Sequence, residues 1–229
     1  QKVIQNRIQT AELIGKEPDV FYSHGISHLD LTYKGKLHAR ELPNFFTDLK
    51  NPDFKMHTVT QHGRFATNTQ PENKRAQPFR SFAHNGEINN IDKLIEGWHE
   101  TFAILKPLIQ ESIGDQLNQE SWAAIENIDL DGSDSAILDE MMDVMRMAGF
   151  SPVAVEALMF QPVIESRPDE QSRYVETFKK IRSIMPAAEG PVGGIVRGIA
   201  PDGNVYFVTA SDKLGCLLYT SDAADDRIC

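Results

Sequence analysis

Cysteine is almost absent from this chain. Only Cys216 and Cys229 occur among its 229 residues, and both lie close to the C-terminal end of the sequence. Two cysteines placed so near one end cannot form a disulfide framework. Their placement predicts a reducing compartment such as the cytoplasm.

Long apolar stretches are also missing. No run approaches the roughly 20 residues that a membrane-spanning helix needs, so we expect no membrane partner. The sequence opens on Gln1 rather than Met, and no basic and apolar leader stands at its start. We therefore expect a fragment of a longer protein.

Positive charge is outweighed by negative charge. The chain has 33 Asp and Glu residues against 23 Lys and Arg residues, a net charge of −10, which argues against a nucleic-acid partner. The acidic residues form no long block, so we expect the charge to serve solubility. The composition, 41% hydrophobic and 24% charged, is that of a globular chain long enough to bury a core.

The common motifs for metals and nucleotides are missing as well. The histidines form no His-Glu-x-x-His pattern and no cluster with cysteine or carboxylates, so no metal site is expected. Residues 190–194, Gly-Pro-Val-Gly-Gly, lack the Lys-Ser/Thr of a phosphate-binding loop, so no nucleotide site is expected either. The seven histidines are His24, His28, His38, His57, His62, His84 and His99.

Hydrophobic periodicity predicts a mixture of strands and helices in the first part of the chain. Alternation predicts strands over residues 29–33, 57–65 and 79–84. A short helix is expected over residues 41–49, and its apolar face would be buried. That face consists of Leu42, Phe45, Phe46 and Leu49.

Helical spacing dominates the middle of the chain. Helices are expected over residues 91–105, 135–148 and 174–185, and a further one opens at Ser151-Pro152. Ser133 or Asp134 can cap the second of these helices, and Gly149 can end it. A hairpin over residues 193–210 follows, so the order of elements predicts an α+β fold rather than a βαβ repeat.

Asn85 and Gly86 follow the strand expected over residues 79–84. An Asn-Gly pair after a strand forms tight turns, because both residues tolerate positive φ. The alternative is an oxyanion hole, in which the Asn side-chain amide and the Gly backbone N–H point at one small volume. The pair alone does not decide between these interpretations.

Arg64 and Asp134 each have a structural and a functional interpretation. Arg64 is either a solvated charge at a strand end or a residue whose planar guanidinium binds a carboxylate through two hydrogen bonds. Thr67 would lie on the same face of an extended chain and could add a hydroxyl group. Asp134 either caps a helix or holds an α-ammonium group at the helix start. An arginine for a carboxylate and an aspartate for an ammonium together describe a site for an α-amino acid.

Four segments resemble, in order, the class II glutamine amidotransferase domain of glutamate synthases. They are His62–Thr69, residues 76–80 (Ala-Gln-Pro-Phe-Arg), residues 84–89 (His-Asn-Gly-Glu-Ile-Asn) and residues 131–136 (Asp-Gly-Ser-Asp-Ser-Ala). The resemblance covers about residues 19–215. It includes Phe21-Tyr22, Tyr33-Lys34-Gly35 and the Glu189-Gly190-Pro191 turn.

The resemblance implies a four-layer αββα N-terminal-nucleophile hydrolase sandwich, incomplete at its N-terminus. It implies that L-glutamine is hydrolysed to glutamate and ammonia, which passes to a synthase domain that carries FMN and an iron–sulfur cluster. The implied roles are carboxylate binding by Arg64, ammonium binding by Asp134, and an oxyanion hole of Asn85 and Gly86. Phe65 and Thr67 would line the glutamine pocket.

The sequence departs from this family in two places. The family's nucleophile is the cysteine that begins the mature chain, whereas position 1 here is Gln and no cysteine precedes Cys216. Residues 216–229 also depart from the pattern, so we expect one partial amidotransferase domain over residues 1–215 and a non-native tail over 216–229. Two alternatives stay open: another class II amidotransferase, and a non-catalytic glutamine-sensing module on the same fold.

Overall fold

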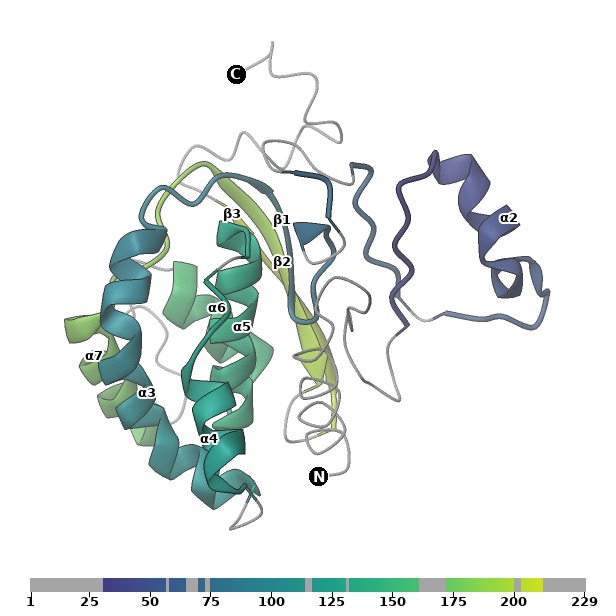
Figure 1. The fold of residues 1–229 in the computed structure, drawn as a ribbon. Helices are drawn as coiled ribbons and strands as arrows, with labels where there is room; N and C mark the ends of the chain where they lie inside the picture. The colour runs from purple at the N-terminus through teal and green to yellow at the C-terminus, as the bar shows by residue number, and fades with distance from the viewer. Residues whose placement is uncertain are drawn as a thin grey trace. The chain divides into compact units, whose positions relative to one another are not determined.

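A computed structural model describes residues 31–56, 58–64, 70–72, 75–113, 117–130, 132–160, 172–199 and 203–211 (Figure 1). The chain divides into two compact units, Lys2–Phe79 and Arg80–Cys229. Each unit is described here by itself.

The described part of the unit Lys2–Phe79 consists of short helical turns. These are η1 (Ala39–Glu41), α2 (Leu42–Phe45) and η2 (Thr47–Lys50). The helix expected over residues 41–49 is interrupted at Phe46, whose φ of −101° and ψ of 89° are not helical. The prediction that Phe45 is buried was wrong, because its side chain is 69% exposed.

Aromatic packing organises the described part of this unit, which contains no sheet. The Tyr33 ring lies 4.9 Å from the Phe46 ring and 6.4 Å from the Phe54 ring, measured between centroids. The Lys34 ammonium lies 5.2 Å from the centre of the Phe79 ring. Residues 31–33 and 58–64 form no strand, so the strands predicted over 29–33 and 57–65 are wrong for their described residues. Alternating hydrophobicity shows that a segment suits a strand, but a strand forms only where a partner strand is available.

The unit Arg80–Cys229 contains an antiparallel sheet in the order β1-β2-β3. Its strands are β1 (Phe82–Gly86), β2 (Val192–Ile199) and β3 (Val205–Ser211). Phe82 lies opposite Val196 in the first ladder, and Ile199 lies opposite Val205 in the second. The hairpin of β2 and β3 was predicted, and β1 begins three residues later than the sequence indicated.

Five helices are described in this unit: α3 (Ile91–Ile113), α4 (Gln119–Glu126), α5 (Asp134–Met147), α6 (Pro152–Phe160) and α7 (Ser172–Ile184). The sequence predicted all of them except α4, which is short and weakly amphipathic. The Asn118 side chain caps α4 by accepting the Ser121 N–H at 2.8 Å. That cap was the available sign of a helix start.

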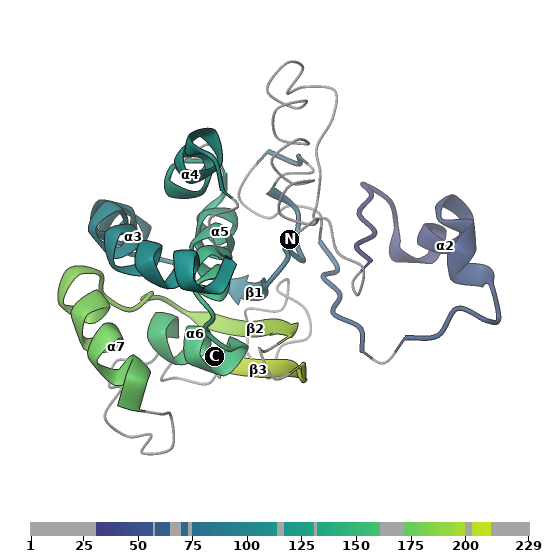
Figure 2. The ribbon, with the colours of Figure 1, turned by 90° about the horizontal axis from the view of Figure 1, so that it is seen from below.

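The helices lie on one side of the sheet (Figures 1 and 2). α5 and α6 pack against the strands, and α3 and α7 lie beyond them. The core between these layers contains completely buried side chains such as Leu94, Met141, Met142 and Val196. The mixed helix-and-strand class is confirmed. The described residues contain a single sheet, so the four-layer arrangement stays a prediction.

α5 begins and ends where the sequence indicated. The Ser133 hydroxyl accepts the Ala136 N–H at 3.3 Å and caps the helix. Gly149 follows the helix with a φ of +92°, a conformation that glycine adopts at little cost. Within the described residues, none of the helices is both long enough and apolar enough to span a bilayer.

Candidate active site

Asn85 and Gly86 are the last two residues of β1. They lie opposite Gly193 and Val192 of β2, so the pair belongs to a sheet ladder and does not form a tight hairpin turn. Gly86 has a φ of +133°, which side-chain-bearing residues rarely adopt. Asn85 is half-buried and Gly86 is exposed, so a strand end presents both residues at the surface of the unit.

The chain that follows Gly86 is held by residues 187–191. The Glu87 N–H donates to the Pro191 carbonyl at 3.1 Å, and the Asn89 N–H donates to the Glu189 carbonyl at 2.7 Å. The buried Asn90 side chain donates to the Ala187 carbonyl and accepts the Glu189 N–H, both at 2.7 Å. These bonds fix the backbone of the residues that follow Gly86.

A hydrogen bond joins β1 to the first turn of α5. The Ser135 Oγ lies 3.1 Å from the His84 Nδ1, and both side chains are only 7% exposed. The His84 ring also stacks on Phe82, with 5.3 Å between ring centroids. Asn85 follows His84 and Asp134 precedes Ser135, so two predicted site residues flank this bond.

Asp134 is the first residue of α5, and its side chain is exposed. Ser133 supplies the helix cap, so the capping interpretation of Asp134 was wrong. Partial desolvation raises the pKa of Asp134, and the nearby carboxylates of Asp92 and Glu87 raise it further, whereas its own backbone N–H lowers it. A cation bound beside these three carboxylates would relieve their mutual repulsion.

Arg64 belongs to the other unit, and its side chain is exposed. Its backbone is held locally, because the His62 Nδ1 lies 2.8 Å from the Arg64 carbonyl oxygen and 3.3 Å from its nitrogen. Phe65 and Thr67 lie outside the described residues. The structure therefore brings together Asn85, Gly86 and the start of α5. The roles of all six predicted site residues stay predictions.

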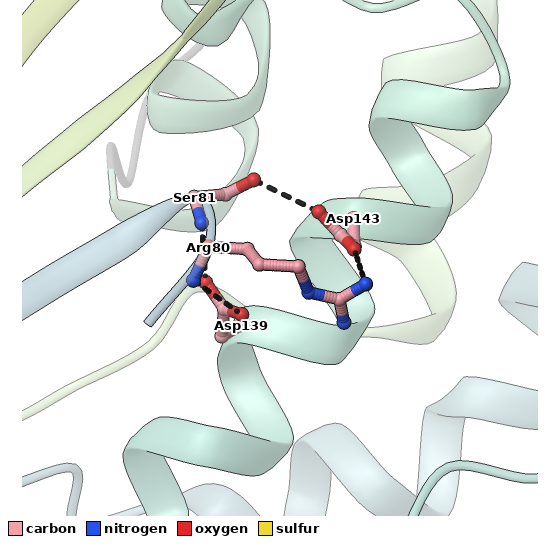
Figure 3. Close-up of polar contacts among 4 residues, drawn as sticks. All are labelled: Arg80, Ser81, Asp139 and Asp143. Atoms are coloured by element: carbon pink, nitrogen blue, oxygen red, sulfur yellow. Dashed lines mark hydrogen bonds and ion pairs between the residues drawn. The ribbon is translucent and has the colours of Figure 1, made fainter. Parts of the chain in front are cut away.

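A partly buried charge cluster lies at the other end of β1, and sequence reasoning missed it (Figure 3). The Asp139 carboxylate of α5 accepts the backbone N–H of Ser81 at 2.8 Å and of Arg80 at 3.2 Å. Asp143, one turn further along α5, accepts the Ser81 hydroxyl at 2.9 Å and pairs with the Arg80 guanidinium at 2.7 Å. The clue in the sequence was that Asp139 and Asp143 stand four residues apart, on one face of the expected helix.

The environment of Asp139 changes its acidity. The pKa of this carboxyl is raised to about 7, because burial and the nearby Asp143 carboxylate outweigh the lowering by Arg80 and the two backbone N–H donors. Burial also raises the pKa of Glu140, against the lowering by the Asp129 N–H and by Arg80. Among the residues that the structure describes, His, Cys, Asp and Glu side chains form no group of three able to hold a metal ion.

Comparison with known proteins identifies the family. The sequence profile of the family described as "Glutamine amidotransferases class-II" matches residues 2–200. The chain belongs to this family.

Glutamate synthases are among its similar relatives. The large chain of the NADPH-dependent glutamate synthase of Bacillus subtilis is 32% identical over 207 residues, which are 85% of this chain and 13% of the relative. The NADH-dependent glutamate synthase of Schizosaccharomyces pombe is 32% identical over 156 residues, 68% of this chain and 7% of the relative. The ferredoxin-dependent glutamate synthase of Cyanidium caldarium is 36% identical over 144 residues, 61% of this chain and 8% of the relative.

These comparisons confirm the resemblance to glutamate synthases, which are enzymes. The chain spans only about a tenth of the length of these relatives.

Proposed function

We propose that this chain binds L-glutamine and stabilises the oxyanion that forms when the glutamine amide is hydrolysed to glutamate and ammonia. The observation that carries the proposal is the His84–Ser135 hydrogen bond. It connects the strand end that carries Asn85 and Gly86 to the helix start that carries Asp134. An oxyanion hole and an ammonium site on adjoining elements suit one small amino-acid substrate.

Each residue takes one task in this proposal. The Asn85 side-chain amide and the Gly86 N–H donate hydrogen bonds to the oxygen of the tetrahedral intermediate. Asp134 binds the α-ammonium group of glutamine, and Arg64 binds its α-carboxylate through two parallel hydrogen bonds. Phe65 and Thr67 are the remaining substrate-binding residues of the proposal.

The covalent step needs a cysteine nucleophile. In the reaction we propose, the cysteine thiol gives its proton to a base and attacks the amide carbon. The proton then passes to the amide nitrogen, the C–N bond breaks, and ammonia leaves. Water then cleaves the thioester and releases glutamate. The residues of this chain named above contribute substrate recognition and oxyanion stabilisation to this reaction.

We propose a second sheet that covers the open face of the β1-β2-β3 sheet, which gives the four-layer N-terminal-nucleophile fold. Val205 and Phe207 of β3 are 63% and 39% exposed, and Ile199 lies opposite Val205 on the same side of the sheet. Val196, by contrast, is completely buried on the helix side. Large apolar side chains exposed on a sheet face normally pack against another layer.

The ammonia is proposed to pass to a synthase domain that makes glutamate from 2-oxoglutarate, on the same chain or another subunit. That domain would carry FMN and an iron–sulfur cluster. The residues of this chain do not fit the cluster, because clusters are held mainly by several cysteine thiolates and only Cys216 and Cys229 are present. Two isolated cysteines and the family relationship together favour a reducing compartment, the cytoplasm or an organelle.

Glutamine binding to the 229-residue chain tests recognition directly. Calorimetric titration is expected to show binding of L-glutamine, and Asp134→Asn is expected to weaken it about tenfold or more, because a charge-assisted hydrogen bond is lost. Asp53→Asn, a change at an exposed carboxylate of the other unit, is the matched control and should leave binding unchanged. If Asp134→Asn also left binding unchanged, the ammonium assignment would be wrong.

Hydrolysis is tested in the complete protein, which carries this chain together with the nucleophilic cysteine. Asn85→Ala is expected to lower kcat of the glutaminase step about 100-fold or more, the usual cost of losing one oxyanion donor. Asn127→Ala removes an exposed amide that bonds only the Ala123 carbonyl, and it should leave kcat unchanged. Glutamine binding without hydrolysis in the complete protein would favour the glutamine-sensing alternative.

A further inference from the structure

Polar contacts attach α5 to the sheet along its whole length. At its first turn Ser135 bonds His84 of β1, and in its middle Asp139 and Asp143 hold the residues that lead into β1. At its last turn the Arg146 guanidinium donates to the carbonyl of Ile199 at the end of β2. Most of the other buried residues of α5 are apolar and would pack in more than one register. The polar contacts select one of these registers.

The order of these contacts shows that α5 and β1 run alongside each other in opposite directions. Along the strand side the contacts run from Arg80 and Ser81, which form the bend before β1, to His84 within β1. Along α5 they run backwards from Asp143 through Asp139 to Ser135. The pairs His84–Ser135 and Arg80–Asp143 form together only when the strand and the helix are in register.

The contact at Asp139 constrains the backbone itself. Its two oxygens accept the N–H groups of two successive residues, Ser81 at 2.8 Å and Arg80 at 3.2 Å (Figure 3). Asp139 is 4% exposed, so water could replace this acceptor only if the helix moved away from the strand. On the other side, the Ser81 carbonyl accepts the Arg197 N–H of β2 at 2.8 Å. The start of β1 is therefore fixed between α5 and β2.

We propose that Ser135 and Asp139 are positioning residues, which lock β1 to α5 and so set the distance between the oxyanion donors at Asn85 and Gly86 and the ammonium-binding Asp134. This inference rests on the proposed function of those three residues. Glutamine carries its α-ammonium and its amide at two ends of one short chain, so the two halves of the site must be held at a matching distance. Neither Ser135 nor Asp139 touches the substrate.

Ser135→Ala tests the contact nearest the site. Alanine favours helix more than serine does, so this change removes the bond to His84 without weakening α5 itself. We expect kcat for glutamine hydrolysis to fall about tenfold, because a small misplacement of the donors lowers the rate. Ser135→Thr keeps the hydroxyl and should restore at least half of the wild-type kcat.

The matched control is Ser151→Ala. Ser151 caps α6, accepting the Ala154 N–H at 3.1 Å, and it bonds neither α5 nor β1. Its loss should lower thermal stability while leaving kcat within about twofold of wild type. Equal kcat values for Ser135→Ala and Ser151→Ala would overturn the positioning role of Ser135.

Asp139→Ala tests the contact at the start of the strand. It is expected to lower kcat and raise KM together, because both halves of the site shift. Asp139→Asn keeps one acceptor oxygen and should recover part of kcat. Glu140→Gln is the control, because the neighbouring Glu140 accepts the Asp129 N–H and does not bond β1. If Asp139→Ala changed stability alone, with kcat and KM as in wild type, its positioning role would be wrong.

A double-mutant comparison separates this inference from the proposed function. If Ser135 acts through the oxyanion donors, adding Ser135→Ala to a chain that already carries Asn85→Ala should lower kcat less than about threefold. A full tenfold cost in that background would contradict the inference even if Asn85→Ala alone behaves as proposed.

Amide hydrogen exchange of the 229-residue chain provides a measurement that does not depend on catalysis. Ser135→Ala should accelerate exchange at Asn85 and Gly86 at least fivefold relative to Ser151→Ala. Unchanged exchange would refute the lock between α5 and β1. Accelerated exchange in a chain that fails to bind glutamine would instead refute the proposed function and leave the lock standing.

Discussion

The Ser135 hydroxyl of α5 lies 3.1 Å from the His84 ring nitrogen of β1, and this buried pair joins two elements that are 51 residues apart in the sequence. The residue after His84 is Asn85, and the residue before Ser135 is Asp134. One hydrogen bond thus relates the two predicted halves of a glutamine site. The positions of both halves follow from the packing of one helix on one strand.

Arg64→Ala is expected to raise the KM for glutamine at least tenfold while leaving ammonia-dependent glutamate synthesis intact. The reason is that a bidentate carboxylate contact would be lost, whereas ammonia has no carboxylate to bind. Steady-state kinetics of the complete protein with each nitrogen source measure this. Arg40→Ala, at a second exposed arginine in the same unit, is the control. Unchanged glutamine kinetics in Arg64→Ala would remove Arg64 from the site.

Gly190→Ala is expected to destabilise the chain and to displace the turn after Gly86. A Cβ at this position would lie 2.2 Å from the Glu87 carbonyl oxygen, and the φ of +144° is one that alanine rarely adopts. Gly203→Ala is a matched control, because its φ of +83° is also unfavourable but nothing lies within 4 Å of the added atom. We expect a cost of about 1 kcal/mol for Gly203→Ala and of several times that for Gly190→Ala, measured by urea unfolding. Equal losses of unfolding free energy in the two variants would show that the turn moves to accommodate the added Cβ at little cost.

The buried Asp139 is expected to make stability depend on pH. Its pKa is raised to about 7 in the folded chain, above the ordinary value of 3.8, so between about pH 4 and pH 7 the folded state binds the proton that the unfolded state has released. The contribution of Asp139 to stability therefore falls as pH rises through this window and is constant above it. Arg80 and Asp143 are the charged groups that act on it.

Asp139→Asn removes this titration. The free energy of unfolding of the wild type, minus that of Asp139→Asn, should fall between pH 4 and pH 7 by up to about 1.4 kcal/mol per pH unit. Urea unfolding of both chains at a series of pH values measures the difference. A difference that stays constant, or rises, across this window would contradict the raised pKa.

Thr101→Val is expected to stabilise the chain. Thr101 of α3 is completely buried, and within the described residues its hydroxyl has no hydrogen-bond partner. Valine has nearly the same shape and buries a methyl group instead, so a gain of about 1 kcal/mol in the free energy of unfolding is expected. Thr101→Ser, which keeps the hydroxyl and removes the methyl group, should lower stability instead. A loss of stability in Thr101→Val would show that the Thr101 hydroxyl forms a hydrogen bond in the folded chain.

The sequence by itself determined the helices α3, α5, α6 and α7 and the hairpin of β2 and β3. These elements depend on local properties, namely the period of the apolar residues, the caps at Ser133 and Ser151, and the turn at Gly203. The family motifs also indicated Asn85, Gly86 and Asp134 as candidates for one site. Local pattern failed for residues 58–64, because an apolar alternation forms a strand only beside a partner.

Tertiary structure decided how these parts are joined. The ladder between β1 and β2, the His84–Ser135 bond and the cluster of Arg80, Asp139 and Asp143 all connect residues more than 50 positions apart. Such pairs cannot be predicted from the pattern of a single sequence. Each partner also suits an ordinary local role, as a strand residue, a helix start or a charge on a helix. Only the packing of α5 against the sheet shows that these polar groups meet, and that they hold β1, the strand that carries Asn85 and Gly86, in one register.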